Sequence, residues 1–244
     1  MGVGEDFQTF CSRLTVSNRD DIGKRYQLIT KRLNTDFRSL DSYTAYSFYA
    51  GSYGRGTATG FVSDADMVYE LPFSYYAQYD KYVTNGQSAL LQAVSRSIQK
   101  TYSSTDVGGD GQVVVVSFTD GVKFEVVPAF KNTDGSYTYP DSNSGGSWKV
   151  TNPKPEIEAI TNRDTACNNN LKPLCRMARA WKETWGVPIG GLLLDTLAYQ
   201  FIENWEHRKK SYFYYDFMSR GVASAGRRDF GKLAHLSRKK SSQS

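Results

Sequence analysis

Two carboxylates stand two positions apart in the stretch 49–71, which reads YAGSYGRGTATGFVSDADMVYEL. Asp64 and Asp66 precede an apolar run that ends at Leu71, so we predict a strand in which both side chains point to one face. Two carboxylates on one face repel each other unless a cation lies between them. The commonest natural solution is a divalent metal ion that also binds a phosphate. The pair therefore predicts metal-assisted phosphate chemistry.

A Gly-Ser pair precedes this D-x-D motif by eleven residues and follows the apolar run 46–50. Gly51 permits close approach of the backbone to a triphosphate, and Ser52 adds an N–H donor and a hydroxyl in a small, Gly-rich loop. Both short patterns are frequent by chance. The alternative interpretation is a β-hairpin with a polar tip and two solvated aspartates.

A third carboxylate, Glu125, lies within the apolar segment 123–129, KFEVVPA. The β-branched runs 112–118 and 122–127 are joined by Thr-Asp-Gly, which predicts a hairpin. Two-metal chemistry needs a third acid from a neighbouring strand, so we expect Glu125 to be a metal ligand, with a water-facing edge glutamate as the alternative. We predict a turn at 108–111. The other nearby acids are predicted to be turn residues and are poorer candidates: Asp106, Asp110 and Asp120.

A cationic stripe follows in the segment 172–182, KPLCRMARAWK. Lys172, Arg176 and Arg179 are spaced i, i+4 and i+7, which places them on one face of a helix. Three like charges on one face destabilise a helix slightly unless an anion lies there, and a triphosphate is such an anion. A solvated basic face is the ordinary alternative. Lys182 extends the same cluster.

Composition restricts the chemistry further. The 244 residues are 39% apolar and 23% charged, which is typical of a globular protein with a substantial core. We expect a soluble, cytoplasmic protein without a membrane partner, because no run approaches the roughly 18 apolar residues of a membrane span. The three cysteines form no C-x-x-C pair and are expected to be reduced. With only His207 and His235, a zinc site or a Ser-His-Asp triad is nearly excluded, so oxygen atoms must hold any metal.

Apolar periodicity predicts a short amphipathic piece at 5–14 and long helices at 18–37 and 86–101. We interpret 131–152 as a loop with at most a short strand. The chain then becomes helical, with candidates at 155–167, 171–185, 190–207 and 211–218. These patterns predict a mixed sheet lobe at 1–153, a helical lobe at 154–218 and a mostly disordered tail at 219–244.

The tail carries most of the positive charge. It holds seven Lys or Arg and one Asp, so its net charge is +6, and the first 218 residues sum to −1 within the total of +5. Clustered Lys and Arg bind phosphate backbones. The tail could therefore be a functional nucleic-acid-binding arm. We favour the alternative that it has no role beyond solubility, because the body lacks the basic surface that activation by nucleic acid would use.

Taken together, three segments resemble the cGAS/DncV-like nucleotidyltransferases (CD-NTases), which belong to the polymerase-β-like superfamily. They are the G-S…D-x-D stretch, VVVVSFTDGVKFEVVPAF (113–130) and KPLCRMARAWKETWGVPIGGLLLDTLAYQFI (172–202). The resemblance covers roughly residues 5–218 and is closest to the bacterial members of CBASS anti-phage systems. It implies an α+β fold, in which a nucleotidyltransferase sheet lobe and a helical lobe have the active site in the cleft between them.

The resemblance also implies roles for residues. Gly51 and Ser52 would hold the nucleotide triphosphate, and Asp64, Asp66 and Glu125 would bind two Mg²⁺ ions, or Mn²⁺ in their place. The third acid of this family is commonly Asp, whereas here it is Glu. Arg179 matches a basic position that supports the donor triphosphate. The expected helpers on the same segment are Lys172, Arg176 and Lys182.

The implied reaction joins NTPs, ATP among them, into a cyclic di- or trinucleotide second messenger and releases pyrophosphate. A separate effector protein would receive the product, and the enzyme would be a monomer that needs no nucleic acid for activity. Two alternatives remain open. One alternative is a linear or protein-directed nucleotidyltransferase. The other is a degenerate module that binds nucleotides without turnover.

Overall fold

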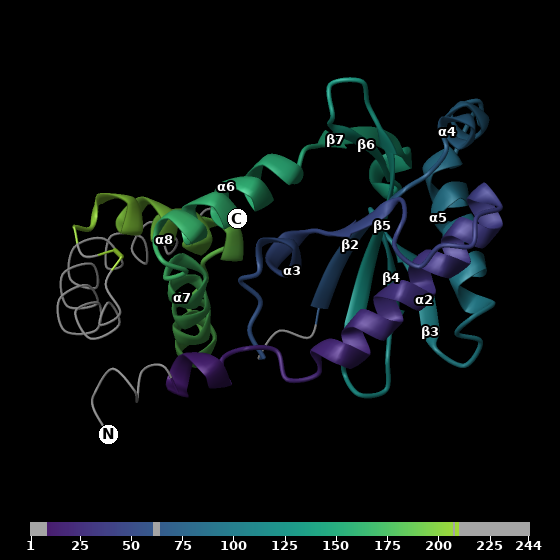
Figure 1. Ribbon diagram of the computed structural model, residues 1–244. Coiled ribbons are helices and arrows are strands. Elements are labelled where there is room, and N and C mark those ends of the chain that lie inside the picture. The colour runs from purple at the N-terminus through teal and green to yellow at the C-terminus, as the bar shows by residue number, and fades with distance from the viewer. Residues whose placement is uncertain (1–8, 61–63, 207, 210–244) are drawn as a thin grey trace. The chain divides into compact units, whose positions relative to one another are not determined.

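The computed structural model describes residues 9–60, 64–206 and 208–209 (Figure 1). The described residues fall into two compact units. One contains 18–54 and the described part of 63–157; the other contains the described parts of 1–17, 55–62 and 158–244. We call them the sheet unit and the helical unit. The predicted helix 211–218, the tail 219–244 and Phe7 of the amphipathic piece lie outside the described residues.

The sheet unit is built on a seven-stranded sheet. Five strands follow the order β1-β2-β5-β4-β3, and the other two are attached through β5, which pairs with β6, which in turn pairs with β7. β2 and β5 run parallel, whereas the other strand pairs are antiparallel. The hairpin predicted around residues 119–121 is confirmed, because β4 pairs with β5 and Gly121 takes a φ of +85° in the turn. The strand bounds are β1 Ser47–Tyr49, β2 Asp64–Glu70, β3 Asp106–Asp110, β4 Val113–Ser117, β5 Lys123–Lys131, β6 Tyr137–Asp141 and β7 Ser147–Thr151.

Helices α2 (Arg19–Arg38) and α5 (Gly86–Gln99) contact each other and the sheet, and both were predicted from apolar periodicity. Buried side chains recur at helical spacing in each, for example Ile22, Ile29 and Leu33 of α2. Acids in the first turn of α2 favour the start of this helix through its dipole. A further helix, α4 (Phe73–Tyr79), directly follows Pro72 and was not predicted.

Three sequence-based expectations in the sheet unit were wrong. Residues 108–110 belong to strand β3 rather than to a turn. The turn consists of Gly111, with its φ of +57°, and Gln112. The segment 131–152 holds two paired strands, β6 and β7, instead of a loop. Finally, the Gly-rich loop after β1 begins as a short helix, α3 (Gly51–Arg55).

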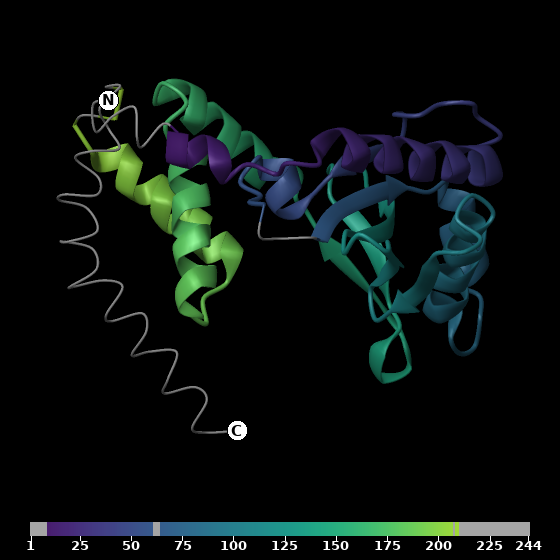
Figure 2. The same cartoon turned by 90° about the horizontal axis from the view of Figure 1, so that it is seen from below.

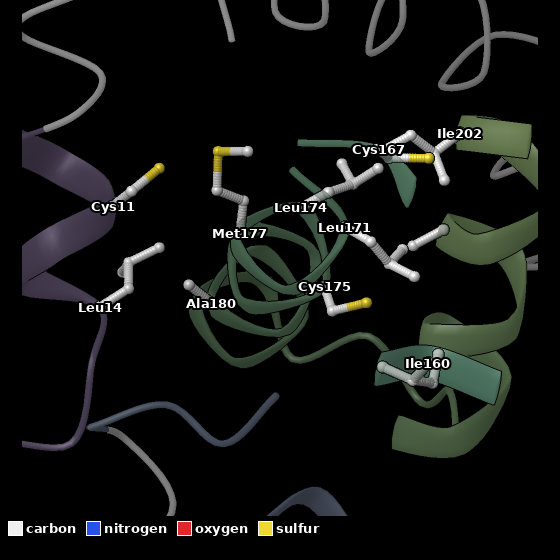
Figure 3. Packing of buried hydrophobic residues seen from close by; sticks show 11 residues of the cluster. Cys11, Leu14, Ile160, Cys167, Leu171, Leu174, Cys175, Met177, Ala180 and Ile202 are labelled. Atoms are coloured by element: carbon white, nitrogen blue, oxygen red, sulfur yellow. The ribbon is translucent and has the colours of Figure 1, made fainter. Parts of the chain in front are cut away.

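The helical unit contains α7 (Leu171–Trp185), α8 (Gly191–Asn204) and most of α6 (Lys154–Ala166), each close to its predicted bounds. Figure 3 shows α7 at the centre of its apolar core. Met177 and Ala180 face Cys11 and Leu14 of the N-terminal segment, where residues 9–13 are helical. Leu171 and Cys175 point to the other side, towards α8. All three cysteines are free and buried in this unit.

Within the residues that the structure describes, no helix combines the length and the apolar character that a membrane crossing needs.

Candidate active site

The parallel pairing of β2 with β5 brings the acids of the sheet unit together. Asp66 is the direct register partner of Glu125, so their backbones lie about 4.8 Å apart across one strand pair. Asp64 shares the face of Asp66, because alternate residues of a strand point the same way. The intervening residues Ala65 and Phe124 are fully buried on the opposite face. One face of this pair is therefore apolar core, and the other carries three half-buried carboxyl groups.

The charge of this acidic face acts on Glu125. Burial raises the pKa of the Glu125 carboxyl above its ordinary value, and the nearby carboxylates of Asp66, Asp64 and Asp110 raise it further. Lys123 opposes them. Asp110 is the last residue of strand β3 rather than the turn residue that its sequence context predicts. Its Gly-Asp-Gly context resembles a turn, which is why sequence reasoning missed its proximity.

The Gly-Ser pair lies against the same acids. Figures 1 and 2 show α3 beside the start of β2, and the Ala50 N–H donates a hydrogen bond of 2.9 Å to the backbone carbonyl of Asp66. A Cβ atom on Gly51 would stand 1.8 Å from Asp66 Oδ2, and Gly51 has a φ of +54°. Only glycine fits here without strain. Ser52, the next residue, is buried.

Stacked tyrosines also connect α3 to β1 and α2. The Tyr49 ring of β1 stacks on Tyr26 of α2 at a centroid distance of 4.2 Å and on Tyr53 of α3 at 5.7 Å. Tyr26 also shares a 2.8 Å hydrogen bond with Ser47 of β1. The turn between β1 and α3 is thus held by β2 through the backbone and by α2 through aromatic rings.

Gly51→Ala is expected to abolish nucleotide turnover and to lower stability by roughly 1–2 kcal/mol from the left-handed backbone alone. The added methyl group also collides with the Asp66 carboxylate and must displace it. Steady-state kinetics and thermal unfolding measure the two effects. As a control, Gly23→Ala adds a methyl group on α2 where nothing lies within 4 Å, so activity should be retained. A fully active Gly51→Ala variant would show that this close approach is irrelevant to function.

The donor atoms of the acidic face fit a hard divalent cation such as Mg²⁺, because all of them are carboxylate oxygens. The raised pKa of Glu125 also fits, since a cation would relieve the repulsion that causes it. Across residues 9–60, 64–206 and 208–209, however, no three His, Cys, Asp or Glu side chains are gathered closely enough to form a metal-binding group. The ligand set of Asp64, Asp66 and Glu125 therefore stays a prediction.

Glu125→Gln should raise the thermal unfolding midpoint in chelator-containing buffer while reducing turnover by about 100-fold or more. The amide removes a charge that burial and three neighbouring carboxylates disfavour, so the metal-free protein gains stability. Differential scanning calorimetry with and without Mg²⁺ tests the first effect, and kinetics the second. A lower midpoint in chelator would contradict the repulsion described above.

The four cations of the predicted stripe lie in the helical unit, on α7, and each already has a polar contact. Arg176 donates a 2.8 Å hydrogen bond to the Gly56 carbonyl. The Lys172 ammonium lies 4.0 Å from Asp164 Oδ2, and that of Lys182 lies 3.1 Å from Glu183 Oε1. Arg179 differs from the others, because its side chain is only 9% exposed and is paired with Asp195.

Sequence reasoning missed the partners of Arg179. Asp195 is fully buried and accepts two hydrogen bonds from Arg179, one from Arg55 and one from Thr57. One signal in the sequence could have revealed a partner for Asp195. This acid lies inside the apolar run GLLLDTLAYQFI of α8, and an acid in such a run is seldom buried without a partner. Arg55 and Thr57 lie about 140 positions away, which no local pattern connects to it.

One protein family matches residues 1–164, and its description is "Second Messenger Oligonucleotide or Dinucleotide Synthetase domain" (SMODS). The chain belongs to the SMODS family. It is therefore a nucleotidyltransferase of the second-messenger synthetases, which confirms the predicted resemblance to the CD-NTases. The match includes Gly51, Ser52, Asp64, Asp66 and Glu125, and it ends before α7.

Solved structures of this class share the fold with the SMODS chain. CdnC of E. coli MS115-1, solved in complex with HORMA-deltaN, has 16% identity and a TM-score of 0.61, and the match covers 88% of this chain and 68% of CdnC. The Rhodothermus marinus CdnE c-UMP-AMP synthase, solved with Apcpp and Upnpp, has 18% identity and a TM-score of 0.55, with coverage of 78% and 72%. The expected α+β nucleotidyltransferase fold is thereby confirmed.

The same fold extends beyond cyclic-nucleotide enzymes. Terminal uridylyl transferase 4 of Trypanosoma brucei, solved with UTP, has 15% identity and a TM-score of 0.51, and the match covers 82% of this chain and 54% of that enzyme. No curated protein matches the SMODS chain.

Proposed function

We propose that this SMODS protein joins NTPs into a cyclic di- or trinucleotide and releases pyrophosphate. One observation carries the proposal: the β2–β5 register sets Asp66 beside Glu125, while Gly51 packs against the Asp66 carboxylate. This arrangement joins a phosphate-binding turn to a group of carboxylates, which is what two-metal nucleotidyl transfer uses. Family membership supports the same reaction.

Each residue of the sheet unit has a proposed role. Gly51 and Ser52 bind the triphosphate, while Asp64, Asp66 and Glu125 hold two Mg²⁺ ions, with Mn²⁺ as the substitute. When bound, the ions supply charge stabilisation to the attacking and leaving oxygens. A ribose 2′- or 3′-hydroxyl of one nucleotide forms a bond to the α-phosphorus of another, and the bond from that phosphorus to pyrophosphate breaks. An acidic side chain of the site accepts the hydroxyl proton.

The cations of α7 have a proposed supporting role. Lys172, Arg176 and Lys182 are partly exposed, and their present contacts with a carbonyl or a carboxylate are of the kind that a triphosphate replaces. Arg179 remains a candidate by its position in the family pattern. Its bidentate bond to a buried carboxylate, however, supports a role in building the helical unit.

The biological setting is also proposed by kinship with the bacterial CD-NTases. The protein acts as a cytoplasmic monomer in anti-phage defence, uses ATP among its substrates and needs no nucleic acid. A separate effector protein receives the product. The sheet lobe is assigned to 1–153 and the helical lobe to 154–218, while the tail 219–244 is dispensable for synthesis.

A linear or protein-directed transferase would use the same carboxylates with another acceptor, and the uridylyl transferase shows that this fold serves such chemistry. A degenerate module would bind nucleotides without turnover. Calorimetry with a non-hydrolysable NTP, run beside a pyrophosphate-release assay with all four NTPs and Mg²⁺, separates enzyme from module. We expect both binding and pyrophosphate release. Binding without release would refute the proposed function.

A further inference from the structure

Asp195 is a hub of buried polar contacts in the helical unit. The residue is 0% exposed, and the side chains of its two arginine partners, Arg55 and Arg179, are 6% and 9% exposed. Its Oδ2 accepts from Arg55 Nε at 2.9 Å, from Thr57 Oγ1 at 2.8 Å and from Arg179 Nη2 at 2.8 Å. Its Oδ1 accepts from Arg179 Nε at 2.9 Å. One carboxylate thus orders three side chains from two distant parts of the sequence.

The segment that Asp195 holds is the continuation of the Gly-Ser turn. Arg55 is the last residue of α3, the five-residue helix that begins with Gly51 and Ser52, and Thr57 follows two residues later. At its start, α3 is fixed to β2 by the Ala50 hydrogen bond and by the close approach of Gly51 to Asp66. At its end, it is fixed through Arg55. So short a helix has little internal stability, and its geometry depends on these two anchors.

Stability alone does not account for this choice of residues. Burying two guanidinium groups against one carboxylate carries a large desolvation penalty, and apolar side chains of similar volume often stabilise a protein as well or better. Charged hydrogen bonds between Arg and a carboxylate instead fix the orientation of the side chains, because the planar guanidinium and carboxylate groups pair in a defined geometry. The hub is also tightly filled, since a Cβ atom on Gly191 would stand 2.6 Å from Arg179 Nη1.

We propose that Asp195 is a positioning residue for nucleotide binding: through Arg55 and Thr57 it fixes the end of α3 and so preorganises the Gly51-Ser52 turn. Arg179 orients the Asp195 carboxylate for this task. The inference rests on the proposed function, because it assigns a purpose to the same turn. Preorganisation matters there, since displacing a binding group by about 1 Å can reduce the rate by roughly a hundredfold.

Thr57→Val gives the sharpest test, because it keeps the shape of the side chain and removes only the hydroxyl that donates to Asp195. Thr57→Ser retains that hydroxyl and serves as the rescue. Asp195→Asn removes the charge from the hub. Ile202→Ala, on the same helix α8 and also fully buried, controls for general loss of stability. All variants are assayed in the full chain well below their unfolding midpoints.

Two readouts are taken from each variant. Hydrogen–deuterium exchange of peptides covering 51–60 reports on the position of α3 without any substrate, and kinetics with NTPs and Mg²⁺ report on function. We expect Thr57→Val and Asp195→Asn to accelerate exchange in 51–60 and to lower kcat/KM by about tenfold or more. Thr57→Ser and Ile202→Ala should resemble the wild type in both.

The outcomes separate the two claims. Wild-type exchange and kinetics in Thr57→Val and Asp195→Asn would overturn the positioning role, as would an equal loss in Ile202→Ala. Faster exchange without any loss of kcat/KM would also overturn it, since the end of α3 would then not matter for the reaction. If the wild type itself shows no turnover, the proposed function fails, and exchange in 51–60 alone still decides whether Asp195 anchors α3.

Discussion

The double substitution of Asp64→Asn and Asp66→Asn is expected to abolish product formation and to leave the protein folded. Both side chains lie on the face of β2 that meets Glu125 of β5, so two of the three predicted metal-binding carboxylates are lost. The same change removes charges that repel Glu125. The unfolding midpoint in metal-free buffer should therefore stay the same or rise. Pyrophosphate release and circular dichroism melting measure the two effects.

A matched control is available on α2. Asp20→Asn with Asp21→Asn makes the same change of charge at two exposed acids of the first helical turn, where the cost is a few tenths of a kcal/mol. This variant should keep wild-type turnover. Turnover near the wild-type rate in the Asp64/Asp66 variant would show that the active site has been assigned to the wrong acids.

The second large effect is expected from Arg179→Ala, which should lower the free energy of unfolding by about 3 kcal/mol or more. The substitution removes two of the hydrogen bonds to the fully buried Asp195 and leaves that carboxylate with Arg55 and Thr57. Urea denaturation monitored by tryptophan fluorescence provides the measurement. Lys182→Ala, three residues further along α7, removes a cation whose contact is with the neighbouring Glu183, and it should change stability by less than about 0.5 kcal/mol.

This experiment also decides between two roles for Arg179. The family pattern predicts support of the donor triphosphate, in which case NTP affinity falls by about 1.5–3 kcal/mol while stability is preserved. The buried pair with Asp195 predicts the opposite result, in which stability falls while NTP affinity is preserved. Unchanged stability together with weakened NTP binding would contradict the structural role.

Sequence patterns predicted the elements whose burial is periodic. α2, α5 and α7 each repeat apolar residues at helical spacing, and β4 and β5 alternate around an Asp-Gly turn. β6 and β7 escaped prediction because YTYPD and SWKVT lie in the segment 131–152, which is rich in the loop-forming residues Gly, Ser, Asn and Asp. Their strand character comes from the pairing of β6 with β5 and with β7. Pairing of that kind is a tertiary property rather than a local one.

The candidate site divides in the same way. Asp64 and Asp66 were predicted because they stand two positions apart at the head of an apolar run, and Glu125 because it lies within one. The parallel register places Asp66 opposite Glu125. The contribution of Asp110 to the same charged region depends on the sheet order β5-β4-β3, which the sequence does not display. The contacts of Asp195 could not be predicted for the same reason, since Arg55 and Thr57 lie about 140 positions away from it in the sequence.

The most direct test of the central claim is the identity of the product. The purified protein is incubated with all four NTPs and Mg²⁺, the mixture is treated with phosphatase, and the remaining nucleotides are identified by mass spectrometry. We predict a phosphatase-resistant cyclic di- or trinucleotide that is absent from the Asp64/Asp66 variant. A product that loses terminal phosphates, and is therefore linear, or a phosphatase-resistant product that the variant still makes, would contradict this account.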